Sequence, residues 1–171
     1  MKKCIAIALL LVVAASAAFT LDFEMSAGLG GVFTLISLSS DDFGVDQSYI
    51  GYGIRGFFDI TYLEAGFAYI FADEDYGNYT EISVLAKYPF DMSSFRLFPM
   101  LGVAYQMNAD YEILDALYLK AGVGADVDLS EMLYVRPTAI VGYHFSSDYK
   151  DVVDDLVGID VEIGVAVGFK F

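Results

Sequence analysis

Apolar and polar residues alternate with a period of two along most of the chain after residue 20. The clearest case is the last stretch, where every odd position from Ile159 to Phe171 is apolar and the even positions hold acidic, small or basic residues. A period of two is typical of a β-strand with two unlike faces. The alternation therefore predicts a β-protein, and the next question is which face of each strand meets water.

The same pattern recurs eight times, which predicts eight strands. They span residues 21–37, 48–59, 63–71, 81–88, 96–107, 119–128, 133–145 and 159–171. The connections after the second, fourth and sixth strands are short, and the others, beginning with SLSSDDFGVDQ, are long and acidic. Short turns at one end and long loops at the other are typical of an up-and-down antiparallel barrel. No linker interrupts the pattern, so we expect one barrel domain at residues 19–171.

The amino-terminal residues have the layout of a cleaved secretory signal, which we expect to cover residues 1–18. Two lysines precede an apolar run from Cys4 to Ala15, and small residues follow this run. The run is shorter than the ~20 residues of a membrane-spanning helix. Cys4 precedes the apolar run, whereas a lipid-modified cysteine follows it. The mature chain is therefore expected to have no cysteine for a disulfide or a thiolate metal site, and we expect no cofactor.

The contents of the two strand faces indicate which one lies outside. One face carries branched and aromatic residues without formal charge, and the other mixes glycine, alanine and ionised residues. The interior of an eight-stranded barrel is only wide enough to be filled by side chains. Small residues and a few long charged ones fit that space, so the bulky face is expected outside, against lipid. The predicted fold class is an all-β, eight-stranded antiparallel up-and-down transmembrane β-barrel.

The inward-facing positions collect charged side chains. Buried charges persist only when they are paired or hydrated, so we expect an ion-pair network in the lumen. Its expected members are Asp22, Glu24, Arg55, Asp59, Glu64, Glu81, Lys87, Arg96, Lys120, Asp126, Asp128, Arg136, His144, Asp160, Glu162 and Lys170. Pro99 and Pro137 each remove a donor from the hydrogen-bond ladder, and we expect a β-bulge near each of them.

Composition restricts the class of protein and of partner. The chain has a formal net charge of -15 and 57% hydrophobic residues. Both properties together argue against disorder and require that the charged and apolar residues occupy different surfaces. The negative charge argues against nucleic acid as a partner.

The whole mature chain resembles the small outer-membrane β-barrel proteins of the OmpA membrane domain, OmpX and OmpW kind, including their spirochaetal relatives. The resemblance rests on the eight-strand plan, on the segment KYPFDMSSFRLFPMLGVAYQ and on the terminal Phe169-Lys170-Phe171. It implies location in the cell outer membrane, with outer-membrane lipid, periplasmic chaperones and the outer-membrane assembly machinery as partners. It also implies that Phe169 and Phe171 are the signal which that machinery reads, although the glycine usual in the signal is Ala166 here.

Three functions stay open. The resemblance implies a non-enzymatic role, in membrane structure or in binding host or surface ligands through acidic loops. A narrow conduit for small or hydrophobic solutes is the second function, which the crowded, charged lumen disfavours. The third is a lipid A-modifying hydrolase, because His144 and Ser146 have a spacing that resembles the outer-membrane lipid A deacylase. The asparagine that follows in that family is missing and His144 is expected in the lumen, so we expect no enzyme.

One acidic connection has part of the character of a calcium loop. Asp73 and Asp75 lie close together in the stretch Asp73–Asn78, and closely spaced carboxylates on a turn suit a hard cation. The stretch does not match the EF-hand template, so a solvated loop without metal is the alternative. Asp73 and Asp75 are therefore weak candidates for divalent-cation ligands.

Overall fold

The computed structural model describes residues 24–40, 44–73, 75–109, 115–147 and 157–171. Its strands are β1 (Met25–Ser40), β2 (Val45–Ile60), β3 (Leu63–Ala72), β4 (Tyr79–Lys87), β5 (Phe90–Asp91), β6 (Arg96–Asn108), β7 (Ala116–Asp128), β8 (Leu133–Ser147) and β9 (Val157–Lys170). Within these ranges, no helix has the length and apolar character of a membrane-crossing helix. The predicted signal at residues 1–18 lies outside the described residues and stays a prediction.

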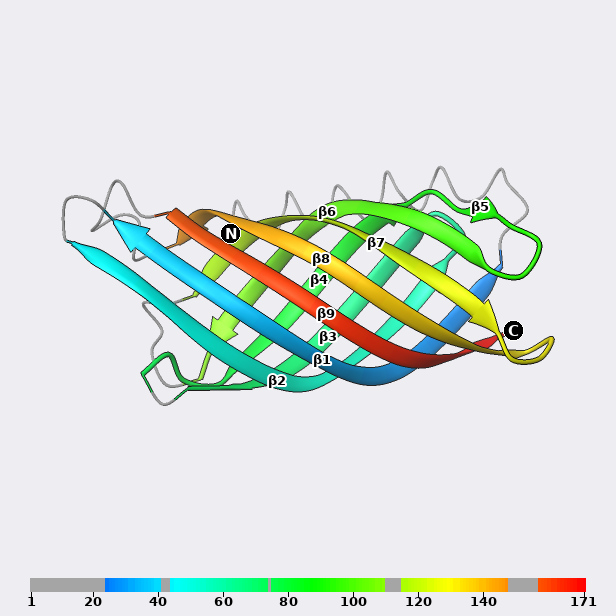
Figure 1. The fold of residues 1–171 in the computed structure, drawn as a ribbon, viewed down its shortest axis with the longest axis horizontal. Helices are drawn as coiled ribbons and strands as arrows, with labels where there is room; N and C mark the ends of the chain where they lie inside the picture. The colour runs from blue at the N-terminus through cyan, green and yellow to red at the C-terminus, as the bar shows by residue number, and fades with distance from the viewer. Residues whose placement is uncertain (1–23, 41–43, 74, 110–114, 148–156) are drawn as a thin grey trace, which may run out of the picture.

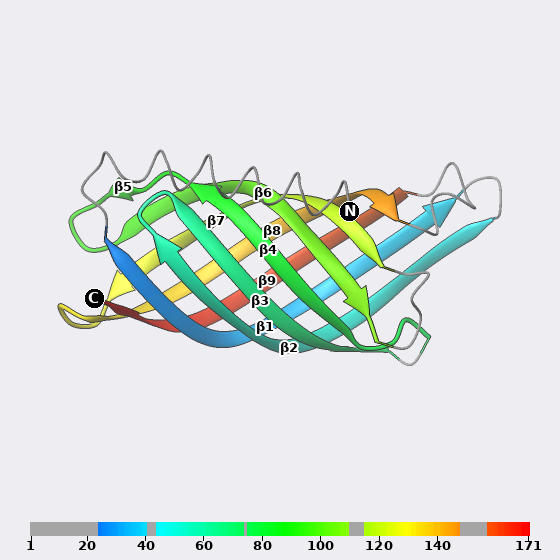
Figure 2. The same ribbon diagram turned by 180° about the vertical axis from the view of Figure 1, so that it is seen from behind.

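The strands form one antiparallel sheet that closes on itself. The order around the sheet is β4-β3-β2-β1-β9-β8-β7-β6, and β4 pairs with β6 to complete the ring. β5 is a two-residue extension that pairs with the start of β6. Figures 1 and 2 show the eight long strands tilted around a single barrel, seen from its two sides. The predicted eight-stranded antiparallel barrel is therefore confirmed, and each long strand has a neighbour on both sides, as a lipid-embedded sheet requires.

The two ends of the barrel differ in their connections. The carboxyl terminus, β5 and the turns after β2, β4 and β7 lie at the right end of Figure 1, and the other connections leave from the left end. The long connection predicted around residues 37–47 is wrong in its bounds, because β1 continues to Ser40 and β2 begins at Val45. The inward-facing Leu38 packs in the core, which explains why the pairing continues. The β1–β2 hairpin consequently projects beyond its neighbours (Figures 1 and 2).

The alternation of the strands separates an apolar outer surface from a polar interior. Along β9, the outward positions from Val157 to Phe169 are all valine, isoleucine or phenylalanine and are exposed. Asp160 and Glu162, between them, are buried inside the barrel. The other strands repeat this arrangement, so the outer surface is an apolar belt of the kind that faces hydrocarbon in transmembrane barrels.

Large aromatic side chains also fill the interior, where we expected only small and charged residues. Three of them lie over a glycine of a neighbouring strand, and a Cβ atom at that glycine would overlap the aromatic ring. The pairs are Phe57 over Gly28, Phe98 over Gly124 and Tyr134 over Gly168. At these places a ring fills the space above a glycine, which lets a narrow barrel reach the packing density of a protein core.

Pro99 and Pro137 cause no shift of register, although the pair of Pro137 with Ala125 is missing from the β7–β8 ladder, so the β-bulge predicted near each proline is wrong. Both prolines pair with a valine of the next strand without a shift of register, and both are exposed on the outer surface. A missing N–H removes one ladder bond but does not by itself require an extra residue. The register shift between β7 and β8 lies instead between Leu117 and Tyr118.

Replacing an interior glycine tests the packing of rings over glycines. In Gly124→Ala, the new Cβ would lie 2.6 Å from Cζ of Phe98 and 3.3 Å from Cγ2 of Thr138. We expect this overpacking to lower the free energy of unfolding by about 1–3 kcal/mol. Gly56→Ala is the control, because Gly56 lies on the outer face of β2 and its nearest atom would be Cδ1 of Leu29 at 3.7 Å. Urea unfolding in lipid vesicles measures both variants, and equal midpoints would contradict the packing argument.

Candidate functional site

The lumen holds six carboxylates and four basic groups that are buried in the described part of the chain. We call this set the charge plug. Its members are Asp59, Glu64, Glu81, Asp126, Asp160, Glu162, Arg55, Lys87, Lys120 and Arg136. They occupy inward positions of β2, β3, β4, β7, β8 and β9, so the ring closure and the strand parity together bring them into one region.

Arg136 organises one half of the charge plug. Its guanidinium donates to both carboxylate oxygens of Asp126, at 2.6 and 2.8 Å, and to one oxygen each of Glu64 and Asp59, at 2.9 and 2.5 Å. Lys87 also pairs with Asp59. Bidentate guanidinium–carboxylate bonds have a fixed geometry and are stronger than neutral hydrogen bonds. The contacts therefore fix the position of Arg136 across the lumen.

Three aromatic rings surround the same guanidinium. Its central carbon lies 4.3 Å from the ring centre of Phe57, 4.8 Å from that of Phe98 and 5.0 Å from that of Tyr134. Ring faces attract a cation, and the attraction is greater where water is excluded. The sequence analysis missed this arrangement, although the parity of β2, β6 and β8 and the glycines opposite were signals for it.

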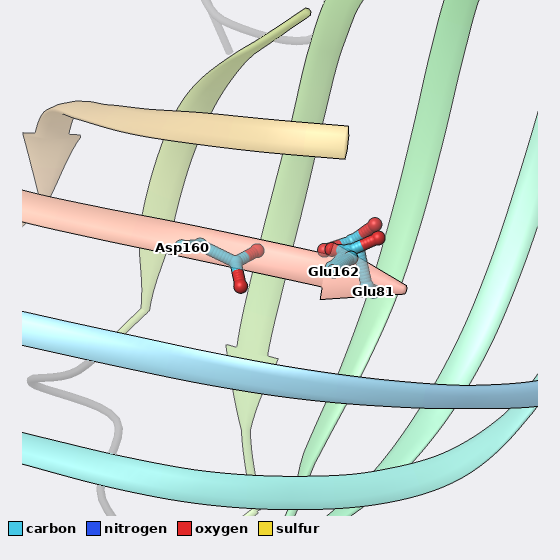
Figure 3. Close-up of side chains that lie close together, drawn as sticks. All are labelled: Glu81, Asp160 and Glu162. Carbon is cyan, nitrogen blue, oxygen red and sulfur yellow. The ribbon is translucent and has the colours of Figure 1, made fainter. Parts of the chain in front are cut away.

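Lys120 organises the other half of the charge plug. Its ammonium lies 2.5 Å from a carboxylate oxygen of Glu81 and 3.1 Å from one of Asp160, and it donates to Glu162. Figure 3 shows Asp160 and Glu162 on β9 and Glu81 beside Glu162. The hydroxyl of Thr34 donates to the second oxygen of Asp160 at 2.5 Å. The strands on opposite sides of the ring are thereby joined through one lysine.

Arg55 joins the two halves of the charge plug. One of its nitrogens lies 3.0 Å from Glu162 and another lies 3.1 Å from Glu64. Glu64 also contacts Arg136, so the ion pairs form a continuous chain from Lys87 to Lys120. Every carboxylate of the charge plug contacts at least one basic group. This compensation is the condition under which buried charges persist.

The carboxylates around Lys120 form a group that has metal-ligand spacing. Within the described residues, one oxygen each of Glu81, Asp160 and Glu162 lie within 4.8 Å of one another. The ammonium of Lys120 contacts all three and supplies the positive charge that a bound cation would bring. We therefore assign this group to ion pairing with Lys120.

The weak metal candidates lie in the β3–β4 connection. The backbone oxygen of Asp73 accepts from the N–H groups of Tyr76 and Gly77 at 3.0 and 2.9 Å. Its carboxylate accepts from the N–H of Ile50 at 3.2 Å, and Asp75 is exposed. Asp73 thus shapes the turn and ties it to β2, and divalent-cation binding by Asp73 and Asp75 stays a prediction.

Four further predicted lumen residues lie at the mouth near the carboxyl terminus. Arg96 pairs with Glu24 and, at 2.6 Å, with Asp91, which the sequence analysis missed. The hydrogen bond from Arg96 holds the pKa of Glu24 below its ordinary value. A second pair joins Lys170 to Asp128 at 2.6 Å, and both pairs are partly exposed. The remaining residue, Asp22, lies outside the described residues.

His144 is buried in the lumen. Its ring stacks on that of Tyr118, with 5.3 Å between the ring centres. The side chain of Ser146 lies outside the described residues. A lipid A hydrolase acts on lipid outside the barrel, whereas His144 faces the interior, so the geometry does not favour that function.

The carboxyl-terminal aromatic residues lie at the seam where β9 meets β1. Phe169 faces outward and is exposed. The N–H of Phe171 donates to the backbone oxygen of Met25 at 3.0 Å, and its side chain is also exposed. Both rings are therefore accessible at the end of the barrel that carries the short turns.

Known proteins match this chain in structure. No protein-family model and no curated protein sequence matches it. The chain is similar to Neisserial surface protein A, with 15% identity, coverage of 87% of this chain and 97% of that chain, and a TM-score of 0.54. It is also similar to the N-terminal β-barrel domain of Pseudomonas aeruginosa OprF, with 16% identity, coverage of 88% and 100%, and a TM-score of 0.52. At these identities the likeness shows the fold alone, which is that of the small outer-membrane β-barrels.

Proposed function

We propose that this protein is an integral protein of the cell outer membrane with a structural or surface-interaction role, and that the charge plug closes its lumen. One observation carries the proposal: the outward strand positions form an apolar belt, while the buried charges lie inside and each carboxylate contacts a basic group. Such a barrel takes outer-membrane lipid as its first partner.

The surface role is assigned to the acidic connections at the end opposite the carboxyl terminus. Asp46, Asp73 and Asp75 are exposed there within the described residues. Most acids of the predicted long connections lie outside the described residues. Charge complementarity favours host or surface ligands with basic groups, and such attraction chiefly increases the association rate.

Delivery to the outer membrane is the second part of the proposal. The signal at residues 1–18 directs export, periplasmic chaperones hold the chain, and the assembly machinery reads Phe169 and Phe171. The exposed rings of these two residues at the end of β9 support this assignment. The geometry of the folded barrel does not otherwise require an exposed Phe171 side chain, because its backbone makes the bond to Met25.

A narrow conduit is the second candidate function. A small hollow, open to solvent, lies at the mouth near the carboxyl terminus and is lined by Lys87, Arg96 and Lys170 among others. It reaches Arg136, whose guanidinium is held by three carboxylates. A solute entering from this end would have to displace those ion pairs, so the structural role is favoured over the conduit.

Conductance across a planar lipid bilayer separates the two candidates. We expect the reconstituted protein to show no stable conductance, because the ion pairs of the charge plug join strands on opposite sides of the lumen. Discrete, long-lived current steps at moderate salt would favour the conduit. A parallel sample of Neisserial surface protein A would provide a barrel of the same fold as a reference.

Removing a cation from the charge plug tests its structural role. In Lys120→Met, three buried carboxylates lose their shared partner, and we expect the free energy of unfolding to fall by about 3–5 kcal/mol. Lys170→Met is the control, because Lys170 forms a partly exposed pair, and pairs of this kind contribute only about 0–1 kcal/mol. Urea unfolding in vesicles measures both. Similar losses in the two variants would mean that the charge plug does not stabilise the barrel.

Shortening the chain by Phe171 tests the assembly signal. We expect the deletion to reduce the amount of folded barrel in the outer membrane, because the assembly machinery no longer recognises the end of β9. Refolding of the same variant from urea into lipid vesicles should stay close to that of the parent, since this reaction needs no machinery. Normal assembly in cells would refute the signal, and impaired refolding in vesicles would indicate a stability effect instead.

A further inference from the structure

Tyr76 fills the interior of the barrel from a connection between strands. All the other buried side chains of the described residues belong to strands. Tyr76 lies in the β3–β4 connection and is only 2% exposed. A side chain in a surface connection is ordinarily solvated, so the burial of this ring requires a specific backbone path.

The backbone of the connection turns the ring back into the barrel. Gly77 has a φ of 80°, in the left-handed region that favours glycine, and directs the chain away from the turn. The side-chain amide of Asn108 donates to the backbone oxygen of Tyr76 at 2.7 Å, and the N–H of Ala109 donates to the oxygen of Asn78 at 2.8 Å. These bonds hold the connection to the end of β6. The bond from the N–H of Ile50 to Asp73 holds it to β2, so the connection is attached to two strands that are not adjacent in the ring.

The ring of Tyr76 packs among other aromatic rings at this mouth. The centre of its ring lies 5.0 Å from that of Tyr49 and 5.8 Å from that of Tyr79. Its hydroxyl donates to Gln106 at 3.3 Å, and burial raises the pKa of the phenol, so the hydroxyl stays neutral and able to donate. The ring belongs to an apolar cluster whose other buried members are Val32, Ile36, Leu38, Ala68, Ile70 and Tyr79.

This aromatic layer adjoins the charge plug, because Ala68 of the apolar cluster pairs with both Arg55 and Glu81. Gln106 contacts both layers, because its amide nitrogen lies 3.3 Å from Glu81 while its oxygen accepts from Tyr76. The charge plug excludes solutes through paired, buried charges. A layer of packed rings and aliphatic side chains excludes ions because a hydrated ion would lose its water there, and this barrier does not depend on charge pairing.

We propose that Tyr76 is a second seal, which closes the extracellular mouth of the barrel independently of the charge plug. The barrel is then closed twice in series, and disturbance of the ion pairs alone does not open it from outside. Tyr76 belongs to the β3–β4 connection at the cell-surface end of the barrel. Of the side chains that fill the lumen, it therefore lies nearest to a surface ligand.

A single cysteine between the two seals tests the proposal. Ala104 is buried in the lumen and pairs with Tyr118. The next inward position of β6 toward the carboxyl-terminal end of the barrel is Gly102, which pairs with Lys120 of the charge plug. Ala104→Cys is introduced into the full chain together with Cys4→Ser. A membrane-impermeant cationic methanethiosulfonate is then added outside cells that carry Tyr76, Tyr76→Phe or Tyr76→Ala in this background. Heat-dependent mobility in gels verifies that each variant forms the folded barrel.

We expect Tyr76→Ala to be labelled at least ~10-fold faster than the parent, a change equivalent to a barrier lowered by ~1.4 kcal/mol. Tyr76→Phe should stay as slow as the parent, because it keeps the ring and loses only the hydroxyl. Fast labelling of the parent, or slow labelling of Tyr76→Ala, would overturn the seal. Labelling of Tyr76→Phe as fast as that of Tyr76→Ala would show that the hydrogen bond and not the ring closes the mouth, which also overturns it.

Addition of the same reagent from the periplasmic side examines the charge plug separately. We expect slow labelling there in all three variants, because Tyr76 lies on the other side of the cysteine. Fast labelling from the periplasmic side alone would contradict closure by the charge plug, whereas the seal depends on the result from outside. The two proposals can therefore fail independently.

Discussion

The closure of the sheet by the pairing of β4 with β6 is the constraint on which the rest of the structure depends. In hydrocarbon, an unpaired backbone N–H or C=O group costs several kcal/mol, so the sheet has to be a ring. A ring of eight strands has a narrow interior of fixed width. All polar side chains of the spanning strands must then share that interior, because the outer surface is occupied by the apolar belt.

Two kinds of complementarity fill this narrow space. Rings such as Phe98 and Tyr134 lie over glycines, so that the space left by the missing side chain is filled by the ring. Charged side chains meet partners of opposite charge, with Arg136 and Lys120 each contacting three carboxylates. The two kinds meet at Arg136, whose guanidinium is held by carboxylates at its edge and by aromatic rings at its faces. Neither size nor charge alone accounts for the filling.

The filling also changes character along the barrel axis. Ion pairs, together with the aromatic rings around Arg136, occupy the mouth near the carboxyl terminus and the middle of the lumen, whereas the apolar cluster of Tyr76 lies toward the end that carries the acidic connections. A barrel filled throughout has little lumen chemistry to offer a substrate. The surfaces that remain for function are the apolar belt, which meets lipid, and the connections at the end opposite the carboxyl terminus.

The sequence by itself determined the number of long strands and which of their residues face inward or outward, because a period of two is a local property of the chain. Only the tertiary structure decided which charges pair, since partners such as Arg55 and Glu162 are 107 residues apart and meet through ring closure. The burial of Tyr76 could not be predicted for the same reason, because it depends on a hydrogen bond from Asn108, 32 residues further along the chain. The unshifted register at Pro137 could not be predicted either, because one missing donor leaves the register to be decided by the neighbouring pairs.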